Sequence, residues 1–194
     1  MHSPAGSHTV ERVVPDSQPA TADSSRTADS RPAGLVVRPL TVADAEQIAT
    51  WQYEGPWRTY DSRPGDGLLS AEAGYQAVAD PATNALVGYI CTGAEARVPG
   101  LAEKAGVVDV GAGMRPDLVG DRVGSEFGAA VLGHIAAHAG SGDFRLRAVV
   151  LDWNERSLHL CARLGFRRVG THTCEQDGRQ NTYFLLETQP EPRT

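Results

Sequence analysis

The segment from Met114 to Ser125 constrains the fold of this chain more than any other stretch. It follows a run of Val and small residues over 106–113 that predicts a strand, and a run over 123–139 that predicts a helix comes after it. Pro116, Gly120 and Gly124 stand in the connection. A strand that turns directly into a helix leaves N–H groups without partners at the positive end of the helix dipole. The segment therefore predicts a phosphate-binding site, although the glycine pair alone also suits an ordinary strand–helix connection.

Composition restricts the class of protein. The 194 residues suit one domain with a sizeable core. The net charge of -6 argues against a nucleic-acid binder, which would carry a basic surface. No apolar run approaches the roughly 20 residues of a membrane span, and the N-terminus has no secretory signal pattern. Three cysteines without metal spacing, Cys91, Cys161 and Cys174, favour a reduced, cytoplasmic protein.

The two ends differ from the middle of the chain. Residues 1–34 are rich in Ser, Pro, Ala, Thr and Asp and contain no aromatic residue. Such a segment cannot bury enough apolar surface to offset its ordering entropy. We therefore expect a disordered N-terminal tail over 1–34, with a docking or regulatory arm as the alternative. The folded domain is expected over 35–188, followed by a short polar tail over 189–194.

Apolar periodicity between these ends predicts a strand, a helix, three strands, a helix, a strand, a helix and two strands. Thr41 and Asp44 have the spacing of a helix N-terminus. Gly111 and Gly113 interrupt the central strand over 106–114, which indicates a bulge or a splay where another backbone or a ligand approaches. The fold class is α/β, with a mixed, mostly antiparallel sheet and flanking helices. The expected strands are 35–40, 73–80, 84–91, 106–114, 144–151, 166–171 and 182–187, and the expected helices are 41–52, 123–139 and 154–165.

A second pattern lies in the third predicted helix, where residues 154–166 spell Asn-x-x-Ser-x-x-Leu-Cys-x-x-x-Gly-Phe. Together the two stretches resemble the GNAT superfamily of CoA-dependent N-acyltransferases. Its patterns are Val-x-Pro, then Arg/Gln-x-x-Gly-x-Gly/Ala, and later Asn-x-x-Ala-x-x-Leu-Tyr-x-x-x-Gly-Phe. The resemblance spans residues 35–188 and is strongest over 105–170. The chain departs from the patterns at Val119 for Arg or Gln, at Arg122 for Gly and at Cys161 for Tyr.

The resemblance implies a GNAT-like fold with a splayed central strand and acetyl-CoA as the acyl donor. Backbone donors depend little on side chains, so Val119 loses a side chain without losing the phosphate nest. If the φ angle of Arg122 is positive, this residue costs a modest amount of conformational free energy. Otherwise its side chain adds a positive charge beside the phosphates. Asp121 must point away from them. Asn154 is expected to cap the helix, to contact the cofactor, or both. The expected cofactor-binding residues are Gly113, Met114, Val119, Gly120, Asp121, Arg122, Val123, Gly124, Ser125 and Asn154.

The catalytic residues are less closely specified. Asp109 on the splayed strand is a candidate base, and a buried carboxylate satisfied by its neighbours is the equal alternative. Glu54, in an aromatic-rich loop over 53–68, is the second candidate. Cys161 stands where relatives carry a Tyr acid, but a small residue that fills space is the favoured interpretation. His134 and His138 have i,i+4 spacing without a third ligand, so no metal site is expected.

These observations predict an N-acetyltransferase that moves an acetyl group from acetyl-CoA to a primary amine of a small molecule or peptide, by direct attack in a ternary complex. The alternative is a non-catalytic acyl-CoA-binding module that acts as a sensor or scaffold, which the three departures favour. An unrelated nucleotide-binding α/β protein is a further rival, against which the pattern from Asn154 to Phe166 counts. The expected partners are the amine acceptor and at most a second copy in a homodimer, without nucleic acid or membrane.

Overall fold

The computed structural model describes residues 34–62, 67–120, 123–138, 144–176 and 178–188. The predicted tails lie outside the described residues, apart from Gly34. The expected order of strands and helices is confirmed throughout this range.

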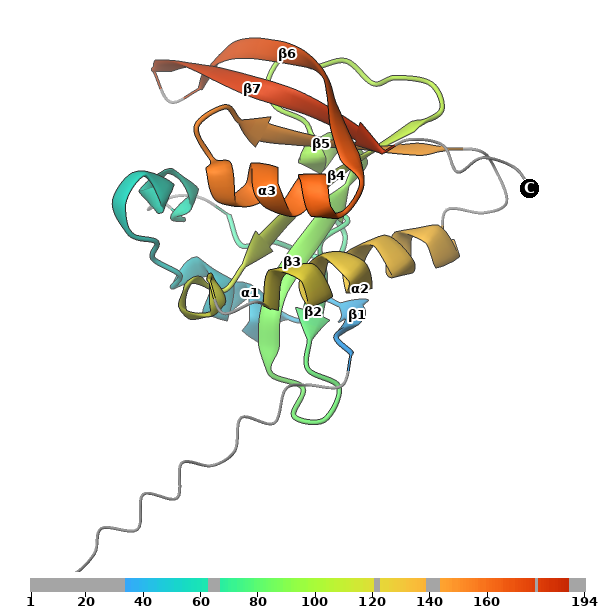
Figure 1. Ribbon diagram of the computed structural model, residues 1–194. Coiled ribbons are helices and arrows are strands. Elements are labelled where there is room, and N and C mark those ends of the chain that lie inside the picture. The colour runs from blue at the N-terminus through green and yellow to red at the C-terminus, as the bar shows by residue number, and fades with distance from the viewer. Residues whose placement is uncertain (1–33, 63–66, 121–122, 139–143, 177, 189–194) are drawn as a thin grey trace, which may run out of the picture. The chain divides into compact units, whose positions relative to one another are not determined.

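The described strands form one mixed sheet in the order β1-β2-β3-β4-β5-β7-β6 (Figure 1). All neighbours are antiparallel except β4 and β5, which run parallel. This confirms the predicted mixed, mostly antiparallel sheet. The strands are β1 (Val36–Pro39), β2 (Gln76–Ala79), β3 (Leu86–Thr92), β4 (Val107–Met114), β5 (Arg145–Leu151), β6 (Phe166–Gln176) and β7 (Arg179–Thr188).

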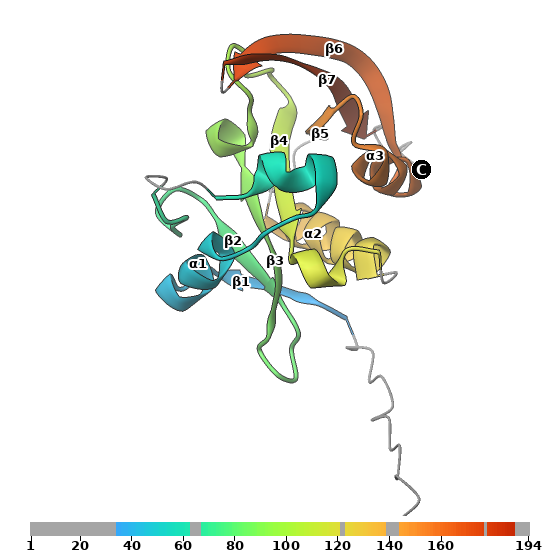
Figure 2. The same cartoon turned by 90° about the vertical axis from the view of Figure 1, so that its left-hand side faces the viewer.

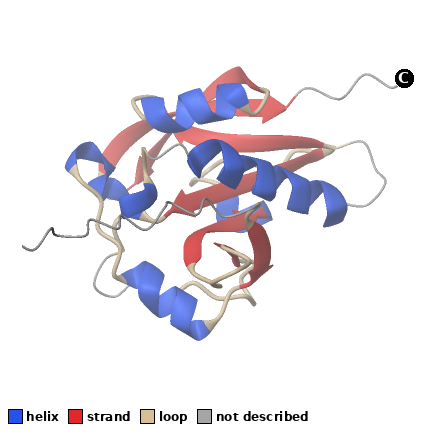
Figure 3. Ribbon diagram, turned by 60° about the horizontal axis from the view of Figure 1, so that its bottom comes forward, coloured by secondary structure: helices blue, strands red, loops and turns tan. Residues whose placement is uncertain are grey.

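Helices cover both faces of the sheet, with α2 and α3 on one face and α1 on the other (Figures 1 and 3). On one face Phe127, Val131 and Ile135 of α2 are buried in the larger core cluster. On the other face Ile48 and Trp51 pack in a smaller cluster. The helices are α1 (Val42–Ala49), α2 (Val123–His138) and α3 (Glu155–Arg163), and the 3-10 turns are η1 (Gly55–Tyr60), η2 (Gly93–Ala96) and η3 (Pro116–Leu118).

The predicted splay of the central strand is confirmed. β4 pairs with β5 only from Val107 to Asp109. Beyond this point Val110–Met114 pairs with β3, and β5 continues beside β7. The β5-facing edge of Val110–Met114 therefore has no strand partner among the described residues. A wedge opens between the two parallel strands toward their carboxyl ends.

The glycines of β4 have a different cause from the one expected. A Cβ at Gly113 would lie 2.5 Å from the Tyr89 ring, and one at Gly111 would lie 2.8 Å from Cys91 Sγ. Tyr89 and Cys91 are their direct partners on β3, and the β3–β4 register runs without a shift. These glycines therefore make room for side chains of the neighbouring strand, and no bulge accompanies them.

A buried ion cluster holds β4 to β5 where the wedge closes. Asp109 is 1% exposed. It accepts from Arg147 Nε at 2.6 Å and Nη2 at 3.1 Å, and from Arg97 Nη1 at 3.1 Å. Arg147 stands opposite Asp109 in the strand register and also donates to the carbonyl of Ala102. The paired charges thus satisfy one another across the last residue pair that the strands share.

A second charged pair orders the start of α1. Arg38 donates to both carboxylate oxygens of Asp44, at 2.6 and 3.0 Å. The Asp44 carboxylate also accepts a hydrogen bond from the Thr41 amide, and the Thr41 side chain accepts one from the Asp44 amide. The predicted helix N-terminus is therefore a capping box. The hydrogen bonds from Arg38 are the main reason that the pKa of Asp44 falls to about 2.

We expect Asp44→Asn to lower the free energy of unfolding by about 2 kcal/mol at pH 7, since a charged hydrogen-bond pair is lost. The folded-state pKa of Asp44 lies below its unfolded value, so the carboxylate contributes stability above about pH 4. That contribution disappears as pH falls through about 2. Denaturant titrations between pH 7 and pH 2 should show the difference from wild type narrowing at the acid end. The exposed neighbour Glu46→Gln is the control, and a difference independent of pH would contradict the pairing.

Asp109→Asn is expected to lower the free energy of unfolding by about 3 kcal/mol, because it leaves a buried guanidinium without its counter-charge. The matched control is Asp117→Asn, whose carboxylate is 66% exposed in its pair with Arg115. That change should shift stability by less than about 0.5 kcal/mol. Urea unfolding of the three proteins makes the comparison. Equal midpoints for Asp109→Asn and wild type would show that the cluster does not hold the strands together.

Candidate functional site

The turn that follows β4 is anchored to the sheet. The Arg115 amide donates to the carbonyl of Val87 at 2.8 Å, and its guanidinium reaches the carbonyl of Leu86 at 2.9 Å. η3 follows, and the Val119 amide closes it by donating to Pro116 at 3.2 Å. Gly120 then has φ +106°, a conformation that residues with a side chain rarely adopt. The predicted glycine turn therefore depends on glycine at this position.

The start of α2 carries amide groups without an acceptor among the described residues. The first amides of a helix have no acceptor within it, which applies to Val123, Gly124 and Ser125. Among the described residues, no hydrogen bond joins these amides or that of Gly120 to another part of the protein outside the helix. Of the predicted donors, Val119 is thus already engaged, and Asp121 and Arg122 lie outside the described residues. The remaining donors stand beside the open end of the wedge.

An aromatic segment around η1 spans this open end (Figure 2). Tyr53 Oη donates to the carbonyl of Met114, the last residue of β4, at 2.9 Å. On the β5 side, Trp57 and Tyr60 lie against Trp153, with ring centroids 6.2 and 6.5 Å apart. The sequence indicated an aromatic-rich loop over 53–68, but it gave no sign that this loop would pack against Trp153. The only local signal was an aromatic residue immediately before the Asn154 pattern.

Asn154 connects this aromatic segment to α3. Its Oδ1 accepts from the Ser157 amide at 3.3 Å, which caps the helix, and from Trp57 Nε1 at 3.2 Å. Its Nδ2 donates to Tyr60 Oη at 2.9 Å. The side chain is buried and its polar atoms are used within the protein. Asn154 therefore fixes where η1 sits relative to the end of β5.

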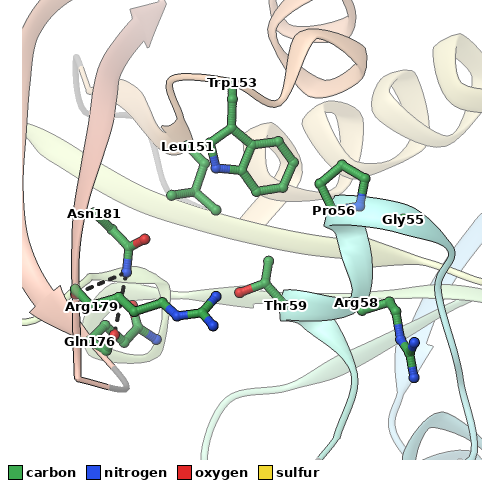
Figure 4. A pocket seen from close by; sticks show the side chains of 9 residues that line it. All are labelled: Gly55, Pro56, Arg58, Thr59, Leu151, Trp153, Gln176, Arg179 and Asn181. Atoms are coloured by element: carbon green, nitrogen blue, oxygen red, sulfur yellow. Dashed lines mark hydrogen bonds between the residues drawn. The ribbon is translucent and has the colours of Figure 1, made fainter.

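A cavity of about 610 Å³ opens between η1 and the β6–β7 hairpin, within the range of small-molecule sites (Figure 4). It lies next to Trp153 and hence to Asn154. Its lining residues are Gly55, Pro56, Arg58, Thr59, Leu151, Trp153, Gln176, Arg179 and Asn181.

The candidate catalytic residues occupy different places. Asp109 lies in the ion cluster at the closed end of the wedge. Cys161 packs against the larger core, and burial raises the pKa of its thiol to about 11. Glu54 is exposed, makes no side-chain cap to η1, and directly precedes the cavity residue Gly55. Only Glu54 of these three adjoins the cavity.

Tyr60 is a further candidate that the sequence left unassigned. Its hydroxyl oxygen accepts from Asn154, and its own proton has no acceptor among the described residues. Burial raises the pKa of this phenol, while the Asn154 hydrogen bond acts in the opposite direction. The hydroxyl therefore holds a proton at the junction of η1 and the start of α3.

Two further findings concern ligands and membranes. Within the described part of the chain, no group of three or more His, Cys, Asp or Glu side chains could hold a metal ion. His134 and His138 stack at 4.1 Å, and a ring nitrogen of His138 bonds the carbonyl of His134. No helix in the described ranges has the length and apolar character needed to cross a membrane.

Comparisons with known proteins agree with this geometry. The model of the acetyltransferase (GNAT) domain family matches residues 34–167. Similar solved structures include a GNAT-family acetyltransferase from Bacillus anthracis, which is 16% identical with a TM-score of 0.59 over 81% of this chain and 95% of that one. A spermidine N-acetyltransferase chimera from Vibrio cholerae and hSSAT is 14% identical, with a TM-score of 0.58 over 80% and 95%.

A ribosomal-protein-S5-alanine acetyltransferase from Vibrio fischeri is 15% identical, with a TM-score of 0.51 over 81% of this chain and 94% of that one. No curated protein matches the chain. At these identities the solved structures show the shared fold, and the domain match covers more than half of the chain. The protein therefore belongs to the GNAT acetyltransferase family.

Proposed function

We propose that the protein is an N-acetyltransferase that moves an acetyl group from acetyl-CoA to a primary amine of a small molecule or peptide. The observation that carries this proposal is the wedge between β4 and β5. It has a helix N-terminus at one side of its mouth and a ligand-sized cavity at the other. Two substrates could thus meet at the open end, and direct attack in a ternary complex needs that arrangement.

The donor would bind through its diphosphate and its amide-containing arm. The amides of Gly120, Val123, Gly124 and Ser125 would hold the diphosphate, together with Asp121 and Arg122 outside the described residues. The arm would lie along the edge of β4 that ends at Gly113 and Met114, where backbone groups without a strand partner among the described residues can accept and donate hydrogen bonds; the Met114 carbonyl is an exception, because it accepts from Tyr53. Asn154 would contribute mainly by positioning η1 and α3.

We propose Glu54 as the group that takes the proton from the amine, since it is exposed, its carboxylate has no ion-pair or hydrogen-bond partner among the described residues, and its neighbour Gly55 lines the cavity. Asp109, the other predicted base, is occupied by two guanidinium groups. The amine nitrogen then attacks the thioester carbonyl carbon, and the carbon–sulfur bond breaks as the tetrahedral intermediate collapses. The departing sulfur takes a proton from the Tyr60 hydroxyl, which has no acceptor among the described residues, and the phenol is then reprotonated from solvent. Cys161 serves as packing.

The central experiment measures release of free CoA thiol from acetyl-CoA across a panel of primary amines, beside acetyl-CoA binding by thermal shift. We expect binding, and thiol release with some amines. Gly120→Ala should weaken acetyl-CoA binding about 10-fold, because Ala is strained at φ +106°. Gly133→Ala, at an open position on α2, is the control and should bind as wild type. Binding without release across the panel would favour a non-catalytic acyl-CoA module.

Variants of the proposed proton-transfer groups should separate chemistry from binding. Glu54→Gln and Tyr60→Phe are each expected to lower kcat about 100-fold while acetyl-CoA binding is retained. Cys161→Ala should leave kcat unchanged, since its thiol packs against the core. If Cys161→Ala lost most of its kcat while Tyr60→Phe stayed fully active, Cys161 and not Tyr60 would be the acid.

A further inference from the structure

The cavity beside η1 is positive, although the protein as a whole is negative. The chain has a net charge of -6, yet the charged residues that line the cavity are Arg58 and Arg179. Among the described residues no carboxylate lines it. A site for a polycationic amine would carry acidic groups at this place, because opposite charges raise local ligand concentration and affinity. The local charge therefore favours a ligand with a negative group.

Of the two arginines, Arg179 is the one that faces the cavity. Figure 4 shows its guanidinium extending from β7 toward Thr59, while the side chain of Arg58 turns away from the cavity. Arg58 is 76% exposed and lies 3.9 Å from the carboxylate of Asp61. Within the described part of the chain, no carboxylate lies within 4.0 Å of Arg179. Its guanidinium, which can only donate hydrogen bonds, thus extends toward the neutral side chain of Thr59 (Figure 4).

The hairpin that carries Arg179 is held in place by its own hydrogen bonds. Gln176, the last residue of β6, pairs with Arg179, the first residue of β7. Asn181 Nδ2 donates to the carbonyls of both at 3.4 Å, and Tyr183 Oη donates to Gln176 Oε1 at 2.8 Å. The Tyr183 contact leaves the amide N–H groups of Gln176 as donors. A cation, an amide donor and the Thr59 hydroxyl therefore line one side of the cavity.

The opposite wall is apolar and adjoins the proposed catalytic groups. It is formed by Pro56, Leu151 and Trp153 (Figure 4). Trp153 precedes Asn154 and contacts Tyr60, and Gly55 follows Glu54. A short molecule with its anionic end at Arg179 would thus lie with its other end toward the groups that handle the amine proton.

We propose that the acceptor is a small amine that also carries a carboxylate, and that Arg179 binds this carboxylate. The inference rests on the proposed acetyl transfer and names its substrate class. The carboxylate end of such an acceptor would lie at Arg179, and its amine end would lie toward Gly55 and the neighbouring Glu54. A planar guanidinium suits a carboxylate because it can donate two parallel hydrogen bonds, which a Lys ammonium cannot.

The test compares α-, β- and γ-amino acids with their own carboxamides as acceptors, with rates expressed per free amine. We expect kcat/KM to favour the carboxylates by about 10-fold or more in the wild-type protein. Arg179→Ala should abolish this preference by weakening the carboxylates alone, and Arg179→Lys should retain part of it. The charge-matched control Arg167→Ala, at the far end of β6, should keep the preference.

A second measurement does not depend on turnover. N-acetylated amino acids and their carboxamides, the expected products, are titrated against the wild-type and Arg179→Ala proteins by calorimetry. Tighter binding of the carboxylates than of the carboxamides, lost in Arg179→Ala, supports the substrate class. That support holds even if no amine releases thiol, because the absence of thiol release would count only against the proposed transfer. Preference for carboxamides or diamines, or a carboxylate preference that survives in Arg179→Ala, would overturn the assignment.

Discussion

The pairing of Asp109 with Arg147 is the interaction on which the geometry of this protein depends. It joins the last residue pair that β4 and β5 share before they part. Parallel strands that stayed paired would leave no unpaired edge and no room between them. By holding the strands at one end only, the ion cluster lets each arm follow its antiparallel neighbour. The divergence at the other end then follows from the register of the sheet.

The open end is stabilised from outside the sheet. A wedge of unpaired backbone exposes polar groups that need partners. The Tyr53 hydroxyl donates a hydrogen bond to the carbonyl of Met114 at the end of β4. On the β5 side, Asn154 anchors the aromatic segment by accepting from Trp57. The aromatic segment around η1 therefore bridges the two arms at the open end of the wedge. A mutation that weakens the Asn154 contacts would alter both sides at once.

Much of the fold could be predicted from local pattern because each element carries its own periodicity and end signals, such as Thr41 and Asp44 for α1 or Gly165 after α3. The glycine turn at Gly120 was likewise visible in the sequence. The role of Asp109 was not, because its partners Arg97 and Arg147 lie 12 and 38 residues away. The position of Trp153 beside Trp57 had no sequence signal for the same reason. Contacts between distant segments decide which polar residues are free to react.

The positions of the charged groups around the cavity indicate more about its ligand than the net charge of the chain does. The net charge of -6 belongs to the whole chain, and some of the acids that contribute to it are paired with basic groups, as Asp44, Asp109 and Glu187 are. A carboxylate held by a guanidinium contributes little field at a distance, because the two charges largely cancel. Arg179 has no such partner among the described residues, so its field is felt in the cavity. The proposed selectivity for a carboxylate-bearing amine therefore depends on Arg179, the charged side chain of the described cavity that faces the ligand.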